Sequence, residues 1–188
     1  VYLVLPRPMI EGQTYTVRFV GINTAETQAE LTYQPREMRS PAVHANQIGY
    51  RPDDPFKRAF VSLWAGTGGD MTPEVTRFEL IDEATGQTVY RGTPAGVHPV
   101  DRPEQFKPVR NHVAADVVHL DFHDFATPGR YRVYVEGVGC SFPFEIGRGA
   151  WADAFRKSMH GFLAHRSGIE LGPPFTDYRR PRNMHPDD

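Results

Sequence analysis

The chain has 188 residues, 39% of them hydrophobic and 12% aromatic, which is enough to bury the core of one domain. We therefore expect a folded chain rather than a disordered one. Its 21 Lys and Arg against 23 Asp and Glu give a net charge of −2, so no overall positive field exists and we expect no nucleic-acid partner. Apolar runs such as 59–65 are far shorter than the roughly 20 residues of a membrane-spanning helix, so we expect no membrane partner.

The two ends of the sequence indicate a piece of a longer protein. The chain begins at Val1 rather than Met, so we expect any start codon or secretory signal to have been removed already. It ends at Asp188 inside a polar run that has no helical cap and no returning strand. The single cysteine, Cys140, cannot close an internal disulfide, so the core and the sheet hydrogen bonds must hold the fold.

Residues 1–39 are expected to form an extra N-terminal β-layer and linker. A strand over 13–20 would place Tyr15, Val17 and Phe19 on one face, because side chains alternate along a strand. The stretch 35–41 contains two prolines and is typical of a linker. We expect the main domain to begin at about Ser40.

Residues 40–148 are expected to form an antiparallel β-sandwich. Hydrophobic residues repeat there with a period near two, in short runs separated by Gly and Pro. Gly86 is placed for a tight hairpin after Glu83, and Pro128-Gly129 is typical of a type II turn. Together with 13–20, the strands predicted on this pattern make seven, which favours a sandwich; they are 58–64, 77–81, 88–91, 117–122, 130–136 and 141–146.

Beyond Gly149 the period changes to that of a helix, over roughly 151–166 and ending before Gly168. Its apolar stripe is broad, so we expect it to pack on the sandwich or on something absent from this chain. After it, a proline- and arginine-rich stretch is predicted to be an irregular tail. The partner-facing residues of the stripe are expected to be Trp151, Phe155, Met159, Phe162 and Leu163.

Several clusters could carry chemistry, and each also has a simpler structural interpretation. The loop Gly66-Thr-Gly-Gly-Asp70 lacks the Lys-Ser/Thr pair of a phosphate-binding loop, so a hairpin loop is favoured. His119, Asp121 and His123 would share one strand face, where they could hold a metal. Because no fourth ligand accompanies them at motif spacing, a solvated strand face is favoured.

The remaining candidates also favour structural roles. His160 and His165 are five residues apart and fall on different helix faces, which excludes a metal pair at i and i+4. Cys140 has no neighbouring histidine, so a buried cysteine is favoured over a catalytic thiolate. Asp187 and Asp188 are interpreted as charged residues at a chain end rather than an acid and base.

The most specific motif of the chain is Asn46-Gln-Ile-Gly-Tyr50. Together with five further segments it resembles the N-terminal immunoglobulin-like domain of family-nine glycoside hydrolases, the cellulase family. Those segments are Lys57-Arg-Ala59, Phe78-Glu-Leu-Ile-Asp82, Thr85-Gly-Gln-Thr-Val-Tyr-Arg-Gly92, Pro128-Gly-Arg-Tyr-Arg-Val-Tyr-Val-Glu-Gly137 and Ser141-Phe-Pro-Phe-Glu-Ile146. Residues 149–188 then resemble the first helix and following tail of that family's (α/α)₆ catalytic barrel. The resemblance covers roughly residues 40–188.

This resemblance implies hydrolysis of β-1,4-glucosidic bonds with inversion, by an acid and a base about 6.5–9.5 Å apart. In the family, the base comes from an Asp-Ala-Gly-Asp motif that would follow Asp188, and the acid is a glutamate near the far C-terminus. Neither motif is present, so we expect no catalytic residue and no cofactor here. Several family members hold a structural zinc through cysteines where this chain has Ser167 and Met184; His185 alone of those ligands is retained, so we expect no zinc.

The first hypothesis is therefore the N-terminal part of a secreted or periplasmic glycoside hydrolase, with the sandwich as a structural brace. The rest of its catalytic domain, or a second copy of this chain, would cover the helix stripe. Two alternatives stay open. The sandwich could itself bind polysaccharide through Trp64, Tyr90 or Tyr134, or the parent protein could be an exo-acting glucosaminidase or another β-glycosidase.

Overall fold

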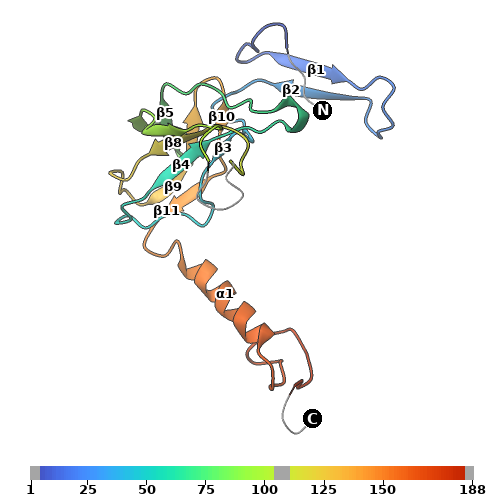
Figure 1. Ribbon diagram of the computed structural model, residues 1–188, viewed down its shortest axis with the longest axis vertical. Helices are drawn as coiled ribbons and strands as arrows, with labels where there is room; N and C mark the ends of the chain where they lie inside the picture. Colours follow the sequence, from blue (N-terminus) through green and yellow to red (C-terminus); the bar gives the residue numbers. More distant parts are fainter. Residues whose placement is uncertain (1–4, 104–110, 185–188) are drawn as a thin grey trace.

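The computed structural model describes residues 5–103 and 111–184 and shows a β-sandwich with two projecting elements, a hairpin and a helix (Figure 1). This confirms a mostly β immunoglobulin-like fold followed by one helix. The strands are β1 (Thr14–Arg18), β2 (Gln28–Thr32), β3 (Val43–His44), β4 (Arg58–Val61), β5 (Phe78–Asp82), β6 (Thr88–Gly92), β7 (Gly96–His98), β8 (Val117–Asp121), β9 (Gly129–Val135), β10 (Gly139–Cys140) and β11 (Phe144–Ile146). The helix is α1 (Ala152–His165), and Gly66–Gly68 form a short 3₁₀ turn.

Two antiparallel sheets make up the sandwich. One has the strand order β10-β9-β5-β6, with β11 also paired to β9, and the other has the order β3-β4-β8-β7. Buried side chains alternate with more exposed ones along β4 and β8, as the period of two predicts. The inward residues of both sheets form one core that includes Val61, Leu80, Leu120, Val133 and Phe144.

The two predicted turns had different outcomes. Gly86 has a φ of 69° in the β5–β6 hairpin, as expected for the position after Thr85. The predicted type II turn at Pro128-Gly129 is wrong, because Gly129 is the first residue of β9 and its φ is not positive. A Cβ on Gly129 would lie 2.4 Å from the Tyr131 hydroxyl, so glycine is needed there for space rather than for a turn.

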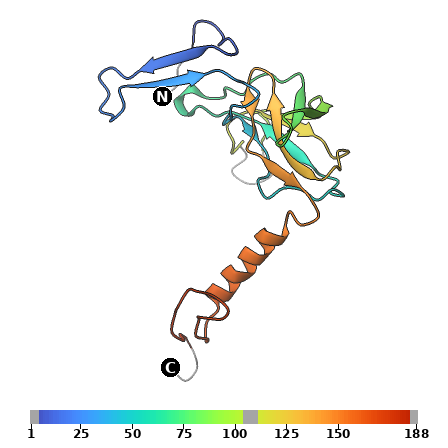
Figure 2. The ribbon, with the colours of Figure 1, turned by 180° about the vertical axis from the view of Figure 1, so that it is seen from behind.

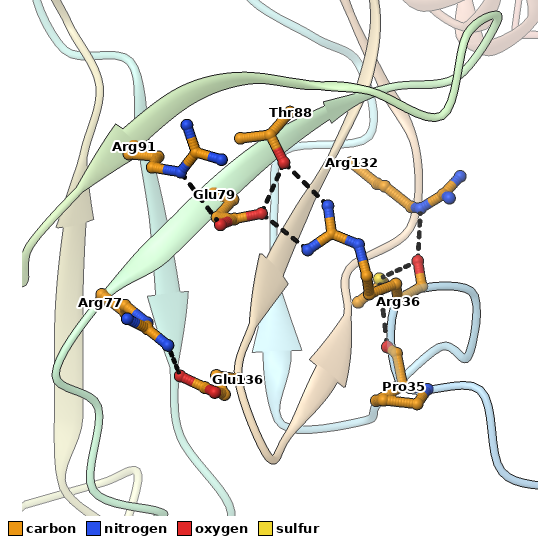
Figure 3. A network of polar contacts seen from close by, with 9 residues as sticks. Pro35, Arg36, Arg77, Glu79, Thr88, Arg91, Arg132 and Glu136 are labelled. Carbon is orange, nitrogen blue, oxygen red and sulfur yellow. Dashed lines mark hydrogen bonds and ion pairs between the residues drawn. The ribbon is translucent and has the colours of Figure 1, made fainter. Parts of the chain in front are cut away.

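The N-terminal hairpin pairs β1 with β2 from Thr14↔Thr32 to Arg18↔Gln28. Tyr15, Val17 and Phe19 are half-buried and alternate with exposed residues, as the sequence predicts. The segment after β2 runs along the sandwich and bonds to it. The Arg36 guanidinium donates to the Glu79 carboxylate and to the Thr88 hydroxyl, both at 2.8 Å (Figure 3).

Helix α1 extends away from the sandwich, and both views show it as a separate arm (Figures 1 and 2). No residue of α1 is buried. Its bounds, Ala152–His165, lie within the predicted 151–166, and Gly168 follows with a φ of 80°. In the described part of the chain, no helix is both long and apolar enough to cross a bilayer.

Candidate functional site at the junction of sandwich and helix

The loop 46–50 lies where the sandwich meets the chain that leads to α1. The Asn46 side chain organises it: Oδ1 accepts from the Ile48 amide at 3.1 Å, and Nδ2 donates to the Gly49 carbonyl at 3.2 Å. Gly49 has a φ of 97°, and a Cβ there would lie 2.4 Å from the Glu145 carbonyl oxygen. Backbone conformation and space therefore both require glycine at this position.

Tyr50 joins this loop to the core. It is buried, and its ring contacts Phe122 and Phe144 edge-to-face, with centroids 5.4 and 5.3 Å away. Its hydroxyl donates to the Arg58 carbonyl at 2.5 Å and accepts from the Asn46 amide at 3.2 Å. Burial raises the pKa of Tyr50, so the hydroxyl stays neutral and available for both bonds.

The same residue fixes the last strand before the helix. The Tyr50 amide donates to the Glu145 carbonyl at 2.8 Å, and the Gly147 amide donates to the Tyr50 carbonyl at 3.0 Å. Ala150 is buried, and its methyl group lies against Gly49. These contacts hold the chain at Glu145, Gly147 and Ala150, and they therefore fix the path by which it leaves the sandwich.

Helix α1 presents its apolar face to solvent. Phe155 and Phe162 are 67% and 70% exposed, Trp151 and Met159 are also exposed, and Leu163 is half-buried. The expectation that the sandwich could cover this stripe is wrong, because the helix points away from both sheets instead of lying across one. Whether the rest of a catalytic domain or a second copy covers it stays a prediction.

The tail after α1 folds back on the end of the helix. Leu171 is buried and exchanges two backbone hydrogen bonds with Arg180, of 2.9 and 3.2 Å. The Arg180 guanidinium also donates to the Ala164 carbonyl at 3.3 Å, which ties the tail to the last turn of α1. This tail is therefore more ordered than the predicted irregular stretch.

The tail also brings the two positions of the expected zinc cysteines together. The Ser167 Oγ lies 3.8 Å from the Met184 Sδ. The two side chains are therefore in contact, but a hydroxyl and a thioether cannot replace two thiolates at a tetrahedral zinc site. His185, Asp187 and Asp188 lie outside the described residues.

On the outer face of β8, the candidate metal cluster forms other bonds. Partial burial would raise the pKa of Asp121, but hydrogen bonds from Arg58 (2.8 Å) and from the His123 amide and ring outweigh it and hold the pKa at about 2. His119 faces Phe60 edge-to-face, and burial lowers its pKa. No group of three metal-ligating side chains is found within 5–103 and 111–184.

The other candidates have structural surroundings. Asp70 accepts from the Thr72 and Asp116 amides, so Gly66–Asp70 closes a loop as predicted. Cys140 is buried, which raises the pKa of its thiol to about 11 and confirms the structural interpretation. His160 and His165 are both exposed.

Taken together, the junction holds no acid–base pair. It offers a fixed exit path from the sandwich and an uncovered apolar helix face. The sequence alone indicated the helix face through its periodicity. The roles of Gly49 and Tyr50 depend on contacts with distant residues such as Glu145, whereas the bonds of Asn46 are local. Only the resemblance singled out all three.

Comparisons with known proteins agree with this architecture. A family model described as the cellulase N-terminal ig-like domain matches residues 38–140. No curated protein sequence matches the chain.

Three solved structures give the same result. A metagenome-derived glycoside hydrolase family 9 endoglucanase is 26% identical, with a TM-score of 0.56, over 76% of this chain and 24% of its own. The family 9 endoglucanase J30 is 25% identical, with a TM-score of 0.52, over 70% of this chain and 21% of its own. A Bacteroides ovatus GH9 protein, 21% identical with a TM-score of 0.52 over 75% of this chain and 22% of its own, shares the fold. The chain spans less than a quarter of the length of each.

Gly49→Ala should strongly destabilise the sandwich, because it adds a clash with the Glu145 carbonyl to the strain of a positive φ. We expect a loss of about 3 kcal/mol or more in the free energy of unfolding, measured by urea denaturation. Gly86→Ala is the matched control: it also has a positive φ, but its Cβ would meet nothing within 4 Å, so about 1 kcal/mol is expected. Equal losses in the two variants would contradict the role of the contact.

Asp121→Asn should make stability less dependent on pH. Because the pKa of Asp121 is lower in the folded than in the unfolded chain, its stabilisation is present above pH 4 and is lost as the pH falls toward 2. After allowance for solvent screening, we expect the variant to lose about 1 kcal/mol at pH 7 and only about a third of that at pH 2.5. Asp53→Asn, at an exposed ion pair, serves as control. A loss that is equal at both pH values would argue against this explanation.

The wild-type chain should bind no stoichiometric zinc, because a hydroxyl and a thioether replace two thiolates. The double variant Ser167→Cys, Met184→Cys should bind more zinc than the wild type, because it supplies two thiolates at positions whose side chains are in contact. Elemental analysis after dialysis measures both. Near-stoichiometric zinc in the wild type that disappears on His185→Ala would overturn the prediction, whereas zinc lost on changing His119 and His123 would indicate the other cluster.

Proposed function

The chain belongs to the family of cellulase N-terminal immunoglobulin-like domains, and on that basis we propose that it is the accessory sandwich and first barrel helix of a cellulase-like glycoside hydrolase. The parent enzyme would hydrolyse β-1,4-linked glucan with inversion, outside the cytoplasm. The sandwich would act as a structural brace, which here means a domain that fixes the position of the catalytic barrel. This chain would supply none of the catalytic carboxylates.

The uncovered face of α1 is the observation that carries this proposal. Fully burying a side chain as large as Phe155 or Phe162 stabilises a protein by about 1.5–3 kcal/mol, so covering four such partly exposed side chains would add at most about 6–12 kcal/mol. That amount is comparable with the stability of a whole domain. The remaining helices of an (α/α)₆ barrel would supply the cover. A second copy of this chain is the alternative cover where those helices are missing.

A fixed junction also suits the chemistry proposed for the parent. Inversion needs the acid and the base about 6.5–9.5 Å apart, with a water molecule between the base and the sugar. Small displacements of such groups lower the rate of the catalysed reaction by large factors. A first helix that is anchored through residues 146–150 to a rigid sandwich would limit such displacements in the barrel.

Direct polysaccharide binding by the sandwich has less support. Two of the three aromatic residues that could stack on a sugar are engaged within the chain. Tyr134 is 8% exposed and lies beneath the Arg36 guanidinium, and the Tyr90 hydroxyl donates to Asp124 at 2.9 Å. Trp64 is 57% exposed, but one ring offers little area for a chain of sugars. An exo-acting glucosaminidase or other β-glycosidase would share the whole arrangement described above and differ in its substrate.

The test compares this chain with the product of the gene read past Asp188. We expect no release of reducing sugar from a soluble cellulose derivative by the 188-residue chain, and release by the longer protein. Intact mass must show that the short chain ends at Asp188, because contaminating parent enzyme would mimic activity. Retention of the short chain on insoluble cellulose, lost on Trp64→Ala, would instead support the binding function.

A longer protein that contains no Asp-Ala-Gly-Asp motif, or that hydrolyses a different β-glycoside and no β-1,4-glucan, would contradict the cellulase proposal. Activity in the 188-residue chain itself would contradict the proposed division of labour between the two parts.

A further inference from the structure

The N-terminal hairpin is an arm with one apolar and one polar face. Cross-strand pairing places Tyr15 opposite Leu31 and Val17 opposite Ala29 on one face. On the other face the Thr14 and Thr32 hydroxyls hydrogen-bond at 2.9 Å. A two-stranded hairpin is marginally stable in water unless its apolar face packs on something. Every residue of β2 is nevertheless exposed.

The base of this arm is fixed to the sandwich. Pro35 is buried, and the Arg36 guanidinium binds Glu79 and Thr88 (Figure 3). The same guanidinium lies over the Tyr134 ring, 4.9 Å from its centroid. The Arg36 carbonyl accepts from the Arg132 Nε at 3.2 Å. Backbone bonds between Cys140 and the segment 38–40, of 2.7 and 2.8 Å, continue the attachment. The hairpin is therefore anchored to the sandwich at its base, through the segment that follows β2.

The tip of the arm is apolar and exposed. Val20 and Ile22 are 87% and 57% exposed, and Glu26 is the one charged residue in 19–27. In both views the hairpin and α1 leave opposite ends of the sandwich and extend toward the same side (Figures 1 and 2). Two elements with exposed apolar side chains thus reach out on one side of the molecule.

We propose that the hairpin is a second docking arm, whose tip at Val20 and Ile22 packs on the helical domain that begins with α1. This inference rests on the proposed function, because it takes the following domain to be the occupant. The matching endoglucanase is about four times longer than the part this chain covers, so a domain large enough to reach both arms would follow α1. Residues 20–23 carry no charge, which suits packing on a protein surface, where an unpaired charge would be costly to bury.

Hydrogen–deuterium exchange on the parent protein and on the 188-residue chain tests the docking. The tip amides of 20–23 should exchange at least tenfold more slowly in the parent, because docking removes them from water. The hairpin turn at 84–87, at another exposed position of the sandwich, should exchange equally in both proteins. Equal exchange at the tip in the two proteins would overturn the proposal.

A double variant at the tip tests the docking independently. Val20→Asp together with Ile22→Asp should lower the unfolding temperature of the parent and abolish the tip protection. The same change should leave the unfolding temperature of the 188-residue chain unchanged, because both side chains are solvent-exposed there. Protection of the tip in the 188-residue chain that grows with concentration would show a second copy as the occupant and would also overturn the proposal. A parent that protects the tip but hydrolyses no glucan would refute the proposed function and leave the docking arm intact.

Discussion

The fold depends most on the position of Tyr50. Its ring is part of the aromatic core with Phe122 and Phe144, and its hydroxyl closes the loop that starts at Asn46. Its backbone holds the strand that leads into α1. A tyrosine can do all three because it combines a large apolar ring with one hydroxyl that both donates and accepts. Tyr50 therefore links the packing of the core, the conformation of loop 46–50 and the path of the chain into α1. Gly49 leaves the space that the Glu145 carbonyl needs beside this loop.

The function we propose follows from what the sandwich holds in place. Arg36 and Tyr50 have parallel roles at opposite ends of the domain. Each fixes the base of an arm, through bonds to Glu79 and Thr88 in one case and to Arg58 and Glu145 in the other. The contact between Ser167 and Met184 adds to this, because it ties the tail to the residues that follow α1. On this proposal, this part of the protein contributes the position of the catalytic groups and not the groups themselves.

Sequence patterns predicted the long elements and missed what depends on distant partners. Strand β5 and helix α1 lie within a residue or two of their predicted ranges, because five or more residues are enough to show a period. Strands β3 and β7 have two and three residues and carry no readable period. The role of Arg36 was invisible because Glu79 is 43 residues away. Pro128-Gly129 forms no turn because Gly129 pairs with Ile146 as the first residue of β9, and glycine is needed there because the Tyr131 ring lies close by.

The central claim is that the sandwich braces the catalytic barrel, and a core substitution far from the junction tests it most directly. Leu80 on β5 is fully buried, so Leu80→Ala should destabilise the sandwich by about 2–5 kcal/mol. In the parent enzyme, a braced barrel should then lose its glucan-hydrolysing activity at a temperature several degrees lower than the wild type does. An unchanged inactivation temperature of the parent enzyme, together with a lower unfolding temperature of the sandwich, would show that the stability of the barrel does not depend on the sandwich.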